Sequence, residues 1–174
     1  VSAGGSEAVL FAFMSCLDPG DEVITPEPFY ANYNGFATTA GVKIIPVTSK
    51  IEEDVALPPL RDMEKKISSK TKGILICNPN NPTGYLYTEE EIRQLREIIV
   101  KHDLFLFSDE VYREFCYDGE KHFSAMHLEG VDDNVILLDS VSKRYSECGV
   151  RIGALITKNA VVLSSALKFA QARL

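Results

Sequence analysis

Short apolar segments alternate with segments of helical periodicity, and this alternation constrains the fold more than any other feature of the chain. The segments "KGILICN", "LFLFSDE" and "NVILLDS" are apolar along most of their length, which is typical of strands covered on both faces of a sheet. Strands that alternate with helices favour a mostly parallel sheet with helices on both faces. The sequence therefore predicts an α/β fold.

The alternation can be assigned to particular stretches of the chain. We expect strands at residues 22–26, 42–47, 72–78, 104–110, 134–140 and 151–157, with one antiparallel strand near the C-terminus. We expect helices at residues 6–17, 29–40, 58–67 and 88–101, and a helix-like run over residues 160–174. No linker or repeat interrupts the pattern, so residues 1–174 are predicted to form one domain.

Local signals support several of these boundaries. Thr88 and Glu91 have the spacing of a capping box, which predicts where the clearest helix begins. Ser6 is expected to cap the first helix. Pro46 cannot donate a backbone hydrogen bond, which indicates that its strand ends at a sheet edge.

Composition excludes several classes of function. The chain has 174 residues, 45% of them hydrophobic, which is enough for one globular domain with a core. A formal net charge of −7 disfavours nucleic acid as a partner, because phosphate binding needs clustered Lys and Arg. No apolar run is long enough to span a membrane, and the four cysteines fit no metal pattern. Free thiols are consistent with a cytoplasmic location.

Polar residues gather directly after the buried strands. "NPNNPTG" follows the third predicted strand, "SDEVY" overlaps the end of the fourth, and "DSVSK" overlaps the end of the fifth. Ligands of open α/β sheets bind beyond the carboxyl ends of the strands. We therefore expect a binding site at this edge of the sheet.

The polar residues at this edge have complementary chemistry. Asp109 can pair with a cationic heterocycle nitrogen, and Tyr112 and Asn81 can hydrogen-bond a phenolic oxygen. Lys143 can form a Schiff base with an aldehyde when it is partly desolvated or near positive charge. Each of these groups matches one part of pyridoxal 5'-phosphate (PLP).

A phosphate site completes the match. Gly4, Gly5 and Ser6 precede a predicted helix and offer backbone N–H groups and a hydroxyl to an anion. Arg151 can hold the same phosphate with two hydrogen bonds.

Five motifs occur in an order that resembles one known family. "GGSEA", "DPGDEV", "NPNNPTG", "SDEVY" and "SVSKRYSECGVRIG" are spread over the whole chain. The chain resembles the large, cofactor-binding domain of the class I/II aminotransferases, the aspartate-aminotransferase-like group of fold type I PLP enzymes. Both ends of the chain look cut, and the resemblance implies that an N-terminal arm and a C-terminal small domain lie outside it. That small domain would supply the arginine that binds the substrate α-carboxylate.

The resemblance implies a role for each catalytic candidate. Lys143 would form the aldimine with the cofactor and then move the proton between the substrate and the cofactor. Asp109 would keep the pyridinium nitrogen protonated. Tyr112 and Asn81 would hydrogen-bond the 3-oxygen of the ring, and the Asn81–Pro82 bond is often cis in the family.

The resemblance also implies a set of residues around the ring face and the phosphate. The phosphate ligands would be Gly5, Ser6, Ser140 and Arg151. Tyr30 would stack on the ring, and Ser142 is either a phosphate neighbour or a turn residue.

Other reactive residues receive structural interpretations. Tyr33 and Cys148 are expected to pack within the fold, in spite of their closeness in sequence to Tyr30 and Lys143. His102, His122 and His127 have no ligand spacing and are expected to be surface or structural residues. No metal site is predicted.

The function implied by the resemblance is PLP-dependent transfer of an amino group between an amino acid and a 2-oxo acid, in a homodimer. Two alternatives stay open. The first is another PLP reaction on the same scaffold, such as that of a C–S lyase, a decarboxylase or a synthase. The second is a PLP-sensing domain of a transcription regulator, which a basic winged-helix segment upstream of this chain would support.

Overall fold

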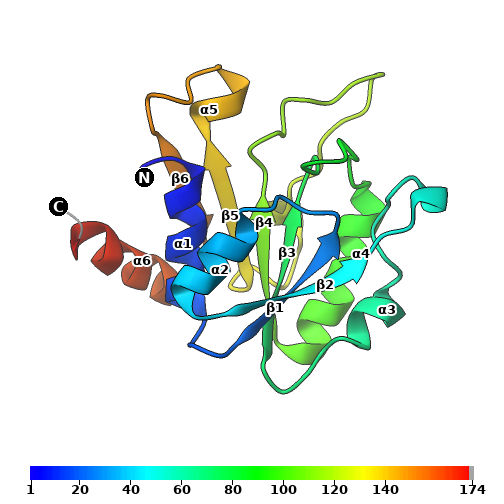
Figure 1. The fold of residues 1–174 in the computed structure, drawn as a ribbon, viewed down its shortest axis with the longest axis horizontal. Helices are drawn as coiled ribbons and strands as arrows, with labels where there is room; N and C mark the ends of the chain where they lie inside the picture. Colours follow the sequence, from blue (N-terminus) through cyan, green and yellow to red (C-terminus); the bar gives the residue numbers. More distant parts are fainter. Residues whose placement is uncertain (173–174) are drawn as a thin grey trace.

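One six-stranded sheet organises the molecule (Figure 1). The computed structural model of the protein describes residues 1–172. The sheet has the order β2-β1-β3-β4-β5-β6, and every neighbouring pair is parallel except β5 with β6, which is antiparallel. The strands are β1 (Glu22–Glu27), β2 (Lys43–Thr48), β3 (Thr71–Cys77), β4 (Phe105–Asp109), β5 (Val135–Ser140) and β6 (Gly153–Thr157).

Helices connect the strands and cover the sheet. They are α1 (Gly5–Cys16), α2 (Tyr33–Ala40), α3 (Leu60–Glu64), α4 (Glu89–His102), α5 (Val141–Arg144) and α6 (Ala160–Ala172), with single 3-10 turns η1 (Ile51–Glu53) and η2 (Ala125–His127). The predicted α/β class and all six predicted strands are confirmed. Residues 173 and 174 of the predicted helix-like run at the C-terminus lie outside the described residues.

Two hydrophobic layers lie on opposite faces of the sheet. On one face, α3 and α4 pack against strand residues such as Ile74 and Ile76. On the other face, α1, α2 and α6 pack against residues such as Leu75 and Cys77. Successive residues of β3 therefore serve opposite faces, as strand geometry requires, and the strand is apolar throughout because both faces are covered.

Local signals located some boundaries correctly. Thr88 and Glu91 form the predicted capping box at the start of α4. Pro46 lies in β2, which is an edge strand as predicted.

Other boundaries differ from the prediction. Ser6 does not cap α1, because the helix begins at Gly5 and Gly4 is the N-cap residue. The Glu7 carboxylate accepts the Ala3 N–H at 2.6 Å near this helix start.

Two predicted helices are shorter than expected. The helix predicted at residues 29–40 begins only at Tyr33, because residues 29–30 are irregular and residues 31–32 form a turn. The helix predicted at residues 58–67 is reduced to Leu60–Glu64. Pro59 keeps an extended backbone at its N-cap, and Pro59 in turn disfavours helical geometry at the residue before it.

The strand order brings distant segments to one edge. The chain moves from β1 to the edge strand β2 and then crosses to β3 on the other side of β1, which makes β1/β3 the topological switch point. The carboxyl ends of the parallel strands meet at this edge. Because β6 is antiparallel and Gly153 pairs with Ser140, the start of β6 lies at the same edge.

Candidate active site

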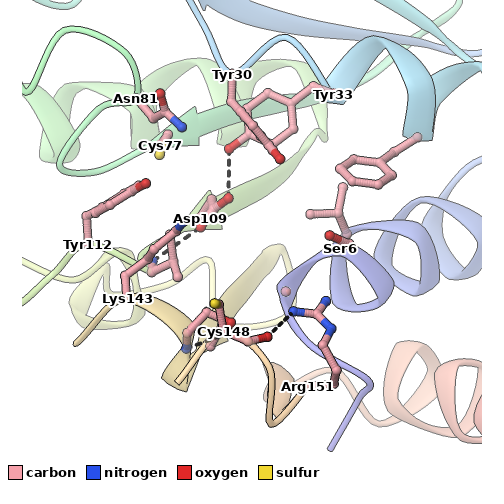
Figure 2. Close-up of a pocket in the computed structure, with 16 residues that line it drawn as sticks. Ser6, Tyr30, Tyr33, Cys77, Asn81, Asp109, Tyr112, Lys143, Cys148 and Arg151 are labelled. Carbon is pink, nitrogen blue, oxygen red and sulfur yellow. Dashed lines mark hydrogen bonds between the residues drawn. The ribbon is translucent and has the colours of Figure 1, made fainter. Parts of the chain in front are cut away.

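One pocket at the carboxyl edge brings the predicted site residues together (Figure 2). It has a volume of about 200 Å³. The nine predicted residues that line it are Gly5, Ser6, Tyr30, Asn81, Asp109, Tyr112, Ser140, Lys143 and Arg151. Their functional roles stay predictions, but their convergence from five separate segments is a property of the fold.

Asp109 lies at the centre of the pocket (Figure 2). It is the last residue of β4, and its carboxylate accepts hydrogen bonds from the Tyr33 hydroxyl at 2.8 Å and from the Val111 N–H at 3.2 Å. Burial raises the pKa of the Asp109 carboxyl above its ordinary value, and these two hydrogen bonds act in the opposite direction. A cation bound beside Asp109 would lower this pKa and stabilise the carboxylate.

Tyr33 is the site residue that the sequence interpretation missed. It was predicted only to pack, yet its buried side chain lines the pocket and holds the Asp109 carboxylate. Burial, followed by the charge of Asp109, raises the pKa of Tyr33 well above the ordinary tyrosine value, so its hydroxyl stays a donor. Its position at the start of a helix that follows a central strand, in the same "PFYANY" segment as Tyr30, was the available signal.

The aromatic residue predicted to stack, Tyr30, lies beside Tyr33. The two rings pack edge to face with their centroids 5.4 Å apart, and Asn32 donates a hydrogen bond to the Tyr30 hydroxyl at 2.7 Å. Figure 2 shows both tyrosines on the opposite side of the pocket from Lys143, Cys148 and Arg151. The pocket therefore has an aromatic wall facing a basic wall.

The loop after β3 presents Asn81 to the pocket. Asn80 fixes this loop, because its side-chain amide donates to the Thr83 hydroxyl at 2.9 Å and to the Pro28 carbonyl at 3.1 Å. The Asn81–Pro82 bond is cis, as it often is in the family that the sequence resembles. Contacts within the loop thus leave Asn81 free to face the site.

Lys143 comes from α5, a single turn directly after β5. The Ser140 hydroxyl accepts the Ser142 N–H at 3.1 Å and caps this turn. The ammonium of Lys143 lies 6.0 Å from the centre of the Tyr112 ring, so the two catalytic candidates face each other.

A close contact between glycines forms the basic end of the pocket. A Cβ on Gly153 would lie 2.4 Å from the Gly4 carbonyl carbon, and one on Gly4 would lie 2.3 Å from Nη2 of Arg151. Arg151 donates to the Ala3 carbonyl at 3.3 Å and to the Cys148 carbonyl at 2.9 Å. The Arg-x-Gly spacing therefore places a guanidinium beside the N-terminus of α1, which favours an anion.

Figure 2 also shows how charge is distributed across the pocket. Lys143 and Tyr112 lie on one side of Asp109, and Ser6 and Arg151 lie on the other. These groups fit PLP: a carboxylate to accept from the ring nitrogen, an amine for the aldehyde, and a guanidinium with a helix N-terminus for the phosphate.

The residue after Asp109 has a structural role. Glu110 is fully buried, and one carboxylate oxygen accepts hydrogen bonds from the Ser108 hydroxyl, the Ser124 hydroxyl and the Ala125 N–H. Its second oxygen lies 3.6 Å from the His122 ring nitrogen. Burial raises the pKa of Glu110 and lowers the pKa of His122. Glu110 therefore anchors η2 to the sheet.

The remaining reactive side chains suggest no second site. Cys148 was predicted to pack, but it is exposed and lines the pocket, because the turn after α5 is at the surface. All four cysteines are free thiols.

Among residues 1–172, no group of three or more His, Cys, Asp or Glu side chains is placed to hold a metal ion. No helix in this part of the chain has the length and apolar character needed to cross a membrane.

Comparison with known proteins decides the family. The sequence profile described as "Aminotransferase class I and II" matches residues 1–173. The chain belongs to the class I and II aminotransferase family. The chain is 37% identical over 154 residues to an aspartate aminotransferase of Bacillus subtilis, an alignment that covers 88% of this chain and 39% of the relative. It is 32% identical over 162 residues to aromatic-amino-acid aminotransferase 2 of Thermococcus litoralis, with coverage of 93% and 41%.

Solved structures of aminotransferases share the fold. An alanine aminotransferase from Pyrococcus furiosus superposes with a TM-score of 0.91 at 34% identity, covering 99% of this chain and 44% of the other. An aspartate aminotransferase from Thermus thermophilus, solved with maleate, gives a TM-score of 0.90 at 31% identity, with coverage of 99% and 44%. The chain spans about two fifths of the length of the curated aminotransferases that it matches.

Proposed function

We propose that the protein containing this chain is a PLP-dependent aminotransferase that moves an amino group between an amino acid and a 2-oxo acid. The observation that carries the proposal is one pocket with Lys143 facing Tyr112, the Asp109 carboxylate at its centre, and Arg151 beside a helix N-terminus. Family membership supports the same reaction.

Each end of the pocket would hold a different part of PLP. Asp109 would pair with the ring nitrogen, and Asn81 and Tyr112 would hydrogen-bond the ring oxygen. Tyr30 would cover the ring face. The residues that would bind the phosphate are Gly5, Ser6, Ser140 and Arg151, and Ser142 also lines the pocket.

The chemistry then divides between cofactor and protein. When bound, PLP supplies an aldehyde that joins amines and a ring that accepts negative charge. Lys143 would act as the general base that removes a proton from the substrate α-carbon, and its ammonium would then give that proton back as a general acid. Asp109 would keep a proton on the ring nitrogen, and the Tyr33 hydroxyl holds the Asp109 carboxylate in place.

We extend the proposal to the setting of the protein. A homodimer is supported by exposed apolar residues on α6, where Val161, Leu163 and Leu167 are 76%, 52% and 55% exposed. A cytoplasmic location and a place in amino acid biosynthesis agree with four free thiols and with relatives named for the transamination of amino acids.

A half-reaction distinguishes transamination from other PLP chemistry. The PLP-loaded full-length protein is mixed with one amino acid at a time, without an acceptor. An aminotransferase releases one equivalent of 2-oxo acid per site and stops until a second 2-oxo acid is added. Repeated turnover without an acceptor would show a lyase or decarboxylase, and no release with any amino acid would favour the sensor alternative.

A further inference from the structure

The turn that carries Lys143 has almost no hydrophobic anchorage. Helix α5 contains only Val141–Arg144, and none of its residues is buried. Figure 1 shows it standing at the end of β5, beyond the layers of the sheet. Polar contacts must therefore decide where Lys143 lies.

Asp139 makes polar contacts on both sides of this turn, in addition to the Ser140 cap. One of its carboxylate oxygens accepts the Ser140 N–H at 2.8 Å and also a hydrogen bond from the Arg144 guanidinium. The other oxygen forms an ion pair with Arg113 at 3.2 Å. The side chains of Asp139 and Arg144 are only 14% and 11% exposed, so solvent weakens this pairing far less than it weakens a surface pair.

The two arginines belong to the segments that carry Tyr112 and Lys143. Arg113 directly follows Tyr112, and Arg144 directly follows Lys143. Neither arginine lines the pocket, and neither does Asp139. One carboxylate thus ties the loop after β4 and the turn after β5 together from behind the site.

The arrangement depends on the negative charge of Asp139. Two guanidinium groups converge there, and the nearest other acid, Glu114, is 61% exposed and lies 3.8 Å from Arg113 and 3.9 Å from Arg144. Without the Asp139 charge, the two cations would face each other with only the exposed Glu114 carboxylate near them. The two segments would then separate.

We propose that Asp139, bridging Arg113 and Arg144, is a positioning residue that fixes the separation of Lys143 and Tyr112. The inference rests on the proposed PLP chemistry, since it concerns how the reacting amine is held. A displacement of about 1 Å in such a group costs on the order of a hundredfold in rate. A small rearrangement of Asp139, Arg113 and Arg144 should therefore have a large effect on the position of Lys143 relative to Tyr112.

The test uses the full-length protein and Asp139→Asn, which removes the charge while keeping the shape. Three quantities are measured: the Kd of PLP by absorbance titration, the pH midpoint of the cofactor's visible band, and the Tm of the PLP-free protein. We expect the Kd to rise about tenfold or more and the pH midpoint to move. Arg144→Lys keeps the cation but loses the planar guanidinium, so its Kd should lie between those of the wild type and Arg144→Met, which loses the contact with Asp139 altogether.

Two controls separate positioning from general loss of stability. Ile98→Val in α4 removes a methyl group from the opposite hydrophobic layer and lowers the Tm without touching the site. Arg93→Met breaks an exposed ion pair with Glu89 on the same helix. Neither should move the pH midpoint.

Three results bear on the inference. It is overturned when Asp139→Asn keeps the wild-type Kd and pH midpoint, or when its Kd changes only as far as that of Ile98→Val at the same loss of Tm. If Asp139→Asn does not fold, the contrast between Arg144→Lys and Arg144→Met decides. A wild-type protein that binds no PLP would instead refute the proposed function.

Discussion

The Tyr33 hydroxyl donates a 2.8 Å hydrogen bond to the Asp109 carboxylate, which connects the start of α2 to the end of β4 across the pocket. Tyr33 is buried, and its hydroxyl remains protonated because burial and the Asp109 charge raise its pKa. The contact keeps one carboxylate oxygen occupied and orients the carboxylate as a whole. Asp109 is therefore held in place before any cofactor binds.

Replacing Tyr33 with Phe tests this contact. The hydrogen bond lowers the pKa of Asp109, so its loss should let burial raise that pKa further. PLP binding requires the ionised Asp109 carboxylate. As the pH is lowered, Tyr33→Phe should therefore lose its PLP affinity at a higher pH than the wild type does. Because the bond is present before PLP binds, its loss acts on the Kd through the orientation and the pKa of Asp109, and we expect the Kd to rise several-fold, most at low pH. PLP titrations from pH 5 to 9 would measure both effects, with Tyr117→Phe, at an exposed tyrosine, as the control. Identical pH profiles for Tyr33→Phe and the wild type would contradict the account.

Asp109→Asn should separate stability from cofactor binding. The folded PLP-free protein raises the pKa of Asp109, so the fold favours the protonated carboxyl and loses stability when it ionises. This penalty is absent below the ordinary pKa of aspartate, grows as the pH rises toward the raised pKa, and is complete above it. Asp109→Asn should therefore raise the Tm of the PLP-free protein at pH 8 but not near pH 3, while it weakens PLP binding by about tenfold to a hundredfold. A lower Tm at pH 8 would show that the carboxylate stabilises the fold.

Much of the site could be predicted because parallel strands end at one edge. Asp109 ends a strand that the apolar pattern made visible, Asn81 and Lys143 each follow one, and the sheet brings their segments together. The role of Tyr33 was not visible, since its partner lies 76 residues away in sequence and a tyrosine on a helix usually packs. Ser6 was misassigned as a cap because the positive φ of Gly4, 82°, moves the helix start one residue earlier.

Gly153→Ala should damage the basic end of the pocket. A Cβ at this position would lie 2.4 Å from the Gly4 carbonyl carbon, so the N-terminal segment must move away from β6. Arg151 hydrogen-bonds that segment, and its position should change with it. We expect PLP and inorganic phosphate to bind about tenfold more weakly, measured by absorbance and calorimetric titration.

A second glycine provides the control for Gly153→Ala. Gly35 lies on the exposed face of α2, and a Cβ there would meet nothing within 4 Å. Gly35→Ala should leave PLP affinity unchanged and stabilise the helix by up to about 1 kcal/mol. Equal effects of the two substitutions on affinity would argue against close packing at Gly153.

Glu110 should prove structural in spite of its place beside Asp109. Glu110→Ala leaves the Ser108 hydroxyl, the Ser124 hydroxyl and the Ala125 N–H without their acceptor, so we expect a loss of about 3 kcal/mol or more in the free energy of unfolding. Glu110→Gln keeps an acceptor oxygen and should cost less than about 1 kcal/mol, because burial already favours the uncharged carboxyl. Urea unfolding of the PLP-free protein measures both, and a Gln variant as unstable as the Ala variant would mean that the charge itself is required.

The ion pairs of Asp139, outside the pocket, could not be predicted from the sequence. Asp139 pairs with Arg113 from one segment and with Arg144 from another. In the sequence, nothing distinguishes these three residues from ordinary surface charges. Only the register of β4 beside β5 brings the three together. Patterns along a chain predict where strands end, whereas pairings between loops depend on the tertiary structure.

Borohydride trapping of PLP on Lys143 tests the central claim most directly. The full-length protein is mixed with PLP, its absorbance is recorded, and the sample is reduced, digested and mapped by mass spectrometry. The account predicts a visible band that reduction abolishes, with the pyridoxyl group on Lys143 alone and no band in Lys143→Ala. A label spread over surface lysines such as Lys65 and Lys101, or a band that persists in Lys143→Ala, would contradict it.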